Sequence, residues 1–111
     1  MESILMKIYE FYTGDEREML LKAYDFAKEA HRNQRRASGE PYFTHPCAVA
    51  EILVDLGLDA ETIAGALLHD VIEDTPATEE DVRREFGEGV LTLVSGVTKL
   101  DKIVFKSQEE E

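Results

Sequence analysis

The chain has few of the features that mark membrane, secreted or nucleic-acid-binding proteins. It contains a single cysteine, Cys47, so no disulfide can form within it, and a reducing, cytoplasmic compartment is expected. No apolar run approaches the roughly 18 residues of a membrane span, and the N-terminus lacks the regions of a signal peptide. Lys and Arg number 12 against 24 Asp and Glu, and this net charge of −12 disfavours general binding of DNA, RNA or anionic lipid.

The composition is that of one small globular domain. At 111 residues the chain has room for a single domain, 1–111, and its 43% of hydrophobic residues is close to the globular average. Strand signals are almost absent, whereas apolar residues recur at helical spacing. The sequence therefore predicts an all-α bundle of about six helices. These cover residues 3–12, 16–35, Pro46 to Gly57, 60–74, Thr78 to Gly87, and a sixth that carries Val90, Leu93, Val94 and Val97.

The last residues, 101–111, have two interpretations. Ser107 to Glu110 has the pattern of a capping box, which predicts the start of a helix, yet only Glu111 follows it in this sequence. This favours a piece of a longer domain that begins another helix here. An acidic, frayed tail is the alternative.

Acidic residues interrupt the apolar helix expected at 60–74. Residues 63–72 are apolar or glycine except for His69 and Asp70, and a helix that is apolar nearly all round is buried. At about 100° per residue, His69, Asp70, Glu73 and Asp74 project within an arc of roughly 140°. Buried carboxylates need a positive partner, which is either a divalent cation or salt bridges to the arginines or Lys99.

His45 favours the metal. It stands just before Pro46 at the start of a helix, where its side chain can point back into a cleft. With His69 and Asp70 it makes a mixed nitrogen and oxygen donor set, which suits Mn²⁺, Fe²⁺ or Zn²⁺ better than Ca²⁺. His31 is interpreted as a surface residue or one that lies behind the ligands.

Four ordered blocks of the sequence resemble one enzyme family. They are 36–42 (RASGEPY), 44–46 (THP), 69–75 (HDVIEDT) and 96–100 (GVTKL). The adjacent His-Asp pair with an earlier His is similar to the HD superfamily of metal-dependent phosphohydrolases. The ordered set resembles the hydrolase domain of the RelA/SpoT homologues, which degrade the alarmone (p)ppGpp, over residues 15–108.

The resemblance implies a role for each matching residue. His45, His69 and Asp70 correspond to metal ligands, with Mn²⁺ as the usual ion, and Glu73 and Asp74 to the acidic pair that handles the attacking water. The reaction implied is removal of the 3′-pyrophosphate to give GDP or GTP. The candidate substrate-binding residues are Arg32, Arg36, Ser38, Tyr42 and Lys99, with Arg36 against the guanine base and 38–42 as a pocket wall. The Arg32 to Arg36 cluster is otherwise a solvated helix end.

Two departures from the family pattern limit the expected activity. Ala37 stands where relatives often carry a second basic residue, and the family's fourth ligand, an aspartate in a later helix, has no counterpart before Glu111. Asp101 is interpreted as outside the ligand pattern. We therefore expect weak metal binding, little turnover, and an exposed apolar patch that favours a homodimer. A non-catalytic helical module and an HD hydrolase of another nucleotide remain the alternative functions.

Overall fold

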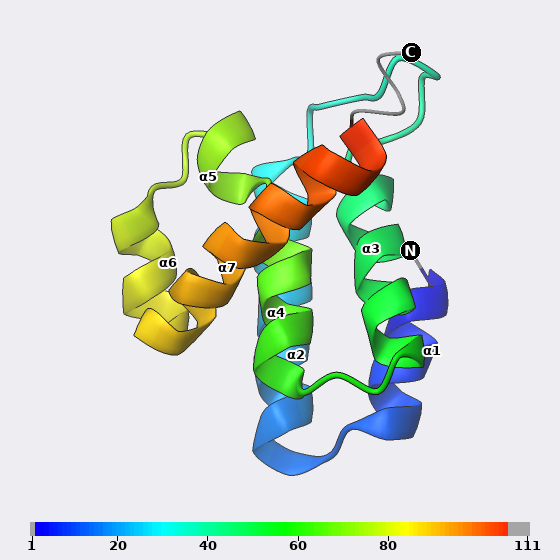
Figure 1. Cartoon of the computed structure of the whole chain (residues 1–111), viewed down its shortest axis with the longest axis vertical. Helices are drawn as coiled ribbons and strands as arrows, with labels where there is room; N and C mark the ends of the chain where they lie inside the picture. Colours follow the sequence, from blue (N-terminus) through cyan, green and yellow to red (C-terminus); the bar gives the residue numbers. More distant parts are fainter. Residues whose placement is uncertain (1, 107–111) are drawn as a thin grey trace.

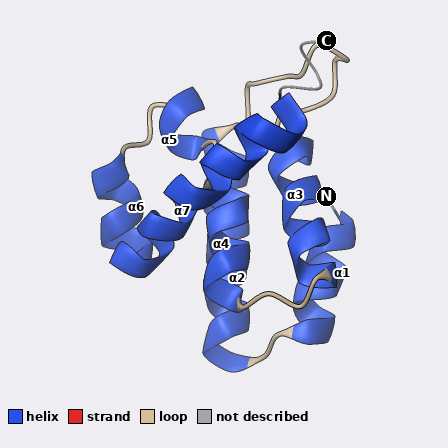
Figure 2. Cartoon of the chain, viewed as in Figure 1, coloured by secondary structure: helices blue, strands red, loops and turns tan. Residues whose placement is uncertain are grey.

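The computed structural model describes residues 2–106, and within that range the chain is helical (Figures 1 and 2). The elements are α1 (Glu2–Phe11), α2 (Gly14–Ala30), α3 (Thr44–Asp55), α4 (Ala60–Leu68), α5 (Val71–Asp74), α6 (Glu79–Phe86), α7 (Glu88–Asp101) and a π-helical turn, η1 (Lys102–Lys106). The one strand-like feature among these residues is an isolated bridge between Arg35 and Pro41. The all-α prediction is confirmed, and no described helix is long and apolar enough to cross a membrane.

Helix α4 forms the centre of the molecule. It packs against α2, α3 and α7, and it lies between them in Figure 1. Every residue from Ile63 to Leu68 is buried, which explains why this segment is apolar on all sides. His69 and Asp70, which directly follow α4, are therefore buried among the surrounding helices.

Gly65 allows α4 and α7 to approach closely. A Cβ atom at this position would lie 3.0 Å from Cβ of Leu93 and 3.1 to 3.2 Å from backbone atoms of Leu93 and Val94. Because backbone atoms cannot rotate away as a side chain can, a larger residue here would separate the helices. The glycine thus sets the distance at which α7 crosses α4.

The helix expected over 60–74 is interrupted. It divides into α4 and α5 at a turn formed by His69 and Asp70, so the prediction of one continuous helix is wrong. The hydroxyl of Thr98 on α7 lies 2.6 Å from the backbone carbonyl of His69 and donates to it, and the His69 amide closes a tighter turn onto Ala66. Tertiary contact with α7 therefore accompanies the break.

The helix expected over 16–35 is also shorter than predicted. Helix α2 ends at Ala30, and a turn follows in which the amide of Gln34 donates to the carbonyl of His31 at 2.9 Å. The chain then doubles back, because the amide of Tyr42 donates to the Gln34 carbonyl at 2.8 Å. The loop between α2 and α3 consequently starts five residues early and reaches back toward α5.

Local capping signals are confirmed at two helix starts. The carboxylate of Asp59 accepts from the amide of Thr62 at 3.0 Å, at the N-terminus of α4. Thr78 and Asp81 form the reciprocal capping box at the start of α6. The pattern at Ser107 to Glu110 lies outside the described residues.

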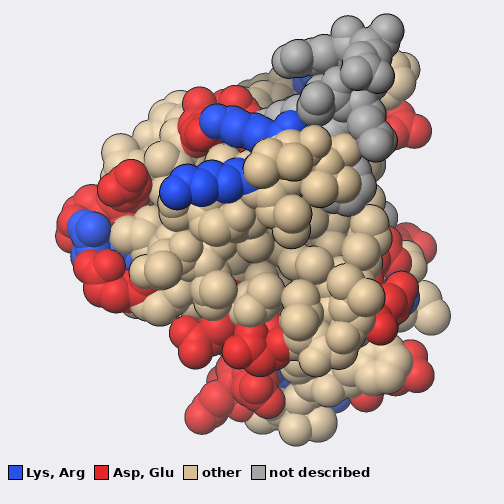
Figure 3. Space-filling model, in the orientation of Figure 1, with Lys and Arg blue, Asp and Glu red and all other residues tan. Residues whose placement is uncertain are grey.

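The surface combines acidic regions with an uncharged face. Figure 3 shows a broad uncharged area over α3 and α7, with acidic groups along its lower edge and basic side chains above it. Several large apolar side chains in or just after α3, in α7 and in η1 are exposed, and all of them except Ile103 line a small cavity of about 180 Å³. They are Ile52, Leu56, Leu100, Ile103 and Val104.

Candidate metal centre

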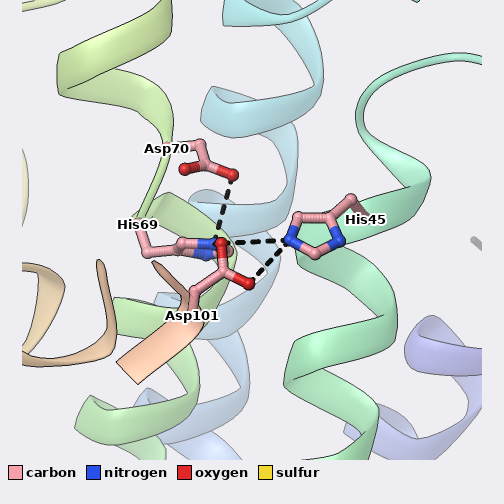
Figure 4. A group of neighbouring side chains, drawn as sticks. All are labelled: His45, His69, Asp70 and Asp101. Carbon is pink, nitrogen blue, oxygen red and sulfur yellow. Dashed lines mark hydrogen bonds and ion pairs between the residues drawn. The ribbon is translucent and has the colours of Figure 1, made fainter. Parts of the chain in front are cut away.

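Two imidazoles and two carboxylates meet in a buried cluster at the end of α4. His45 comes from the first turn of α3, His69 and Asp70 from the turn between α4 and α5, and Asp101 from the last position of α7 (Figure 4). One donor atom from each lies within 4.8 Å of the other three. The exposed fraction of each residue is 6% or less.

Asp101 bridges the two histidines. Its Oδ1 atom lies 2.9 Å from Nε2 of His45, and its Oδ2 atom lies 2.9 Å from Nε2 of His69 (Figure 4). Nε2 of His69 also lies 3.1 Å from Oδ2 of Asp70. All four side chains therefore face one point between three helical segments.

The backbone fixes the orientation of His69. Its Nδ1 atom lies 2.6 Å from the carbonyl oxygen of Ala66, and since a carbonyl only accepts, Nδ1 carries the hydrogen and donates it. This contact aims Nε2 at the two carboxylates. An imidazole held by a backbone carbonyl in this way is a common arrangement for a metal ligand.

The carboxylates alter the proton affinity of the cluster. Burial by itself would lower the pKa of His69, but the hydrogen bonds to Asp101 and Asp70 outweigh it and raise that pKa to about 9. Burial would raise the pKa of Asp101, and contact with His69 and His45 more than reverses this, so that pKa is lowered. Without a metal ion, the positive charge of protonated His69 offsets the negative charge of the Asp70 and Asp101 carboxylates.

The donor set fits a divalent transition metal. Imidazole nitrogen and carboxylate oxygen together suit Mn²⁺, Fe²⁺ and Zn²⁺. Four side-chain donors are a usual number of protein ligands for such an ion. Binding an ion requires that His69 lose its Nε2 proton, so metal and proton compete for the same place. The side chains are near enough for one ion to contact all four.

Asp101 corrects the sequence interpretation. The sequence pattern predicts that it lies outside the ligand set, whereas the structure places its carboxylate between the two histidines. A signal was present, because Val94, Val97 and Asp101 follow helical spacing and Asp101 continues the buried stripe of α7. Asp101 lies near the histidines because α7 crosses α4, and the spacing of residues along the sequence does not reveal this crossing.

Glu73 and Asp74 do not share the buried face with Asp70. The break at His69 and Asp70 ends the expected arc, and both residues are exposed on α5, so the expectation of three buried carboxylates on one face is wrong. Glu73 accepts from Nζ of Lys102 at 2.8 Å, a partner that the sequence interpretation did not name. Asp74 remains close to the cluster, since its Oδ2 lies 3.3 Å from the Tyr42 hydroxyl.

The candidate substrate-binding residues lie in two regions. Lys99 lines a cavity of about 680 Å³ that also touches His69, Glu73 and Lys102. Arg32 is exposed, pairs with Glu29 at 2.7 Å and lines a different hollow beside Thr75. Exposed Ser38 and partly buried Arg36 lie on the loop between α2 and α3.

Tyr42 and His31 lie closer to the cluster than the sequence suggested. The Tyr42 hydroxyl donates to Oδ2 of Asp70 at 2.7 Å, and burial together with this contact raises the pKa of Tyr42. His31 is only 1% exposed and packs its ring on that of Tyr42, so it is no surface residue. Its place behind Tyr42 agrees with the second interpretation, of a residue behind the ligands.

Comparison with known proteins identifies relatives that are similar in sequence to this chain. The chain is 51% identical over 109 residues to the bifunctional (p)ppGpp synthase/hydrolase SpoT of Escherichia coli K12, and 49% identical over 111 residues to the guanosine-3′,5′-bis(diphosphate) 3′-pyrophosphohydrolase of Aquifex aeolicus. The matches cover 98% and 100% of this chain but 16% of each relative.

A solved structure shares the fold. It is described as a metazoan ortholog of SpoT that hydrolyzes ppGpp and plays a role in starvation responses. It superimposes with a TM-score of 0.68 and 37% identity, over 78% of this chain and 49% of that one. A family model described as "HD domain" matches residues 23–111, which include all four residues of the cluster. The chain thus belongs to the HD domain family.

Proposed function

We propose that this chain supplies the metal-binding part of a (p)ppGpp 3′-pyrophosphohydrolase, which yields GDP or GTP and pyrophosphate. The observation that carries the proposal is the buried cluster of His45, His69, Asp70 and Asp101 in a chain similar to enzymes with that name. The chain spans 16% of the length of those relatives, so the activity belongs to the proposal.

The cluster would hold Mn²⁺ through these four side chains. When bound, such an ion lowers the pKa of a water molecule and stabilises negative charge on phosphoryl oxygens. The expectation of weak binding depended on a missing fourth ligand, and Asp101 would supply one from within this chain. Mn²⁺ is proposed over Fe²⁺ and Zn²⁺ from the family resemblance alone.

The exposed carboxylates beside the cluster are the proposed proton acceptors. Hydrolysis forms a bond from the water oxygen to the phosphorus on the 3′ oxygen, and the bond from that phosphorus to the 3′ oxygen breaks. The water gives up a proton, which Glu73 or Asp74 accepts, and the leaving 3′ oxygen gains one. Both residues stand on α5, within one turn of Asp70.

The basic side chains would contact the guanosine polyphosphate. Lys99 lines the cavity that reaches His69. Its positive charge would attract a phosphate group there, although acidic side chains line the same cavity. Arg36 and Ser38 would contact the nucleoside from the loop between α2 and α3, which also carries Tyr42, and Arg32 would add charge at its start.

The experiment is release of pyrophosphate from ppGpp with Mn²⁺ present, using the Escherichia coli relative as the positive control. The wild-type chain is compared with Asp70→Asn and with Asp25→Asn, an exposed aspartate on α2. Loss of activity in Asp70→Asn alone supports the proposal. Equal activity in all three proteins overturns it, and activity on a different nucleotide would show another HD hydrolase.

We also propose that the exposed apolar side chains of α3 and α7 allow two copies to associate. Leu56 is 68% exposed and Leu100 is 47% exposed, and both line the small cavity of about 180 Å³. Light scattering on the chain and on Leu56→Glu tests this. A monomeric wild-type chain at all concentrations would contradict it. Location in the cytoplasm is proposed from the single, buried Cys47.

A further inference from the structure

The Tyr42 hydroxyl stands between two carboxylates. It lies 2.7 Å from Oδ2 of Asp70 and 3.3 Å from Oδ2 of Asp74. A phenol has one proton to donate, and the shorter contact is the stronger hydrogen bond, so Asp70 is its main acceptor. The oxygen of Asp70 that accepts this bond is also the one that lies 3.1 Å from Nε2 of His69. The hydroxyl thus contacts the ligand cluster from outside.

The ring of Tyr42 is itself held in place. It packs against the ring of His31 with a centroid separation of 5.0 Å and an interplanar angle of 37°. His31 is 1% exposed, so this neighbour cannot move aside into solvent. The backbone amide of Tyr42 donates to the carbonyl of Gln34 at 2.8 Å. The position of the hydroxyl therefore follows from packing and not from a flexible loop end.

Gln34 joins this support to α5. Its side-chain oxygen lies 2.8 Å from Nδ1 of His31, which must donate because an amide oxygen only accepts. Its side-chain nitrogen donates to the backbone carbonyl of Asp74. The loop after α2 consequently contacts Asp74 twice, at its backbone through Gln34 and at its carboxylate through Tyr42.

We propose that Tyr42 is a positioning residue: it fixes the Asp70 carboxylate toward the metal and holds Asp74 at a set distance from it, with His31 and Gln34 as its supports. The proposal rests on the metal-dependent function proposed above. A carboxylate can rotate about its last bond, and a hydrogen bond to one oxygen removes that freedom. The hydroxyl also separates two like charges that would otherwise repel across the gap.

This role differs from the pocket wall that the family resemblance implies. A wall residue contacts substrate, so its loss raises KM and leaves the affinity for metal unchanged. A positioning residue acts through Asp70, so its loss weakens metal binding in the absence of any nucleotide. The two roles can therefore be separated by a measurement that contains no substrate.

The test is Mn²⁺ binding by calorimetry to the wild-type chain, to Tyr42→Phe and to Tyr12→Phe. Tyr12→Phe is a matched control, because the Tyr12 hydroxyl donates at 2.9 Å to the carbonyl of Leu58, which lies at the opposite end of α4 from the cluster. Phenylalanine keeps the ring that packs on His31 and removes only the donor. We expect binding about tenfold weaker in Tyr42→Phe and unchanged in Tyr12→Phe, with kcat lowered and KM unaltered for ppGpp.

Several results would overturn the proposal. Equal Mn²⁺ affinity in Tyr42→Phe and the wild-type chain does so, whether or not KM rises. If the wild-type chain binds Mn²⁺ without hydrolysing ppGpp, the proposed function fails while the affinity comparison still decides the role of Tyr42. A wild-type chain that binds no divalent metal overturns both. Should Tyr42→Phe not fold, Gln34→Met removes a support instead, and a smaller loss of Mn²⁺ affinity is expected from it.

Discussion

Nε2 of His69 lies 2.9 Å from Oδ2 of Asp101, although 32 positions separate the two residues in the chain. The contact joins the end of α4 to the end of α7 at a point where both side chains are buried. It ties the candidate metal centre to the packing of the two helices.

Replacing Asp101 with Asn should weaken Mn²⁺ binding by about tenfold or more, because an amide oxygen is a poorer ligand than a carboxylate. Calorimetric titration of the chain measures this. Asp25→Asn, on the exposed side of α2, is the control and should bind as the wild-type chain does. Unchanged affinity in Asp101→Asn would show that Asp101 serves only as a counter-ion for the histidines.

The metal-free chain should lose stability as pH rises toward 9. The pKa of His69 is raised from 6.5 to about 9 by its carboxylate neighbours, so folding favours its protonated form. That contribution is fully present below pH 6.5 and is lost as pH passes through about 9. Urea unfolding at pH 6 and at pH 9.5, with a chelator present, checks the direction.

His69→Gln is the comparison for this pH series. Without the titrating imidazole beside Asp70 and Asp101, the free energy of unfolding should change less between the two pH values. A wild-type chain whose stability does not fall across this range would show that His69 is not held in its protonated form.

Two glycines in helices should respond in opposite ways to alanine. Gly96→Ala places a Cβ where no heavy atom lies within 4 Å, so it should stabilise α7 by up to about 1 kcal/mol. Gly65→Ala places one 3.0 to 3.2 Å from Leu93 and the Val94 backbone. We expect Gly65→Ala to be less stable than Gly96→Ala by about 1–3 kcal/mol in urea unfolding. Equal stabilities would mean that α7 can shift at no cost.

Thr98→Val should destabilise the fold by about 1–3 kcal/mol, since it removes the hydroxyl that donates to the His69 carbonyl and keeps the shape of the side chain. It should also weaken Mn²⁺ binding, because that hydrogen bond holds the turn that carries two ligands. Thr92→Val, on the exposed side of the same helix, is the matched control. A loss of stability common to both variants would assign the effect to the helix and not to the turn.

Several features of the protein follow from local sequence patterns alone. Spacing of apolar residues is enough to identify most of the helices, and the capping box of Thr78 and Asp81 marks the start of α6. His69 and Asp70 could be identified because they interrupt an apolar segment. His45 could be identified because it lies just before Pro46, where a loop leads into a helix. Each of these signals depends on residues a few positions apart, and the structure brings the three side chains together.

Two helix boundaries depend on contacts between distant segments of the chain. The end of α2 at Ala30 accompanies the burial of His31 against Tyr42, and the helix expected over 60–74 breaks where Thr98 contacts the His69 carbonyl. Spacing cannot reveal either contact, because both partners come from separate elements.

The amino-acid sequence by itself determined the helical class and the two histidines and one aspartate at the centre, because helical periodicity and an interrupted apolar face are local properties of the chain. Only the tertiary structure decided that Asp101 lies beside them and that the Tyr42 hydroxyl donates to Asp70. The physical reason is that both relationships depend on the angle and distance at which packed elements meet, and close contact between buried helices sets these over the whole core.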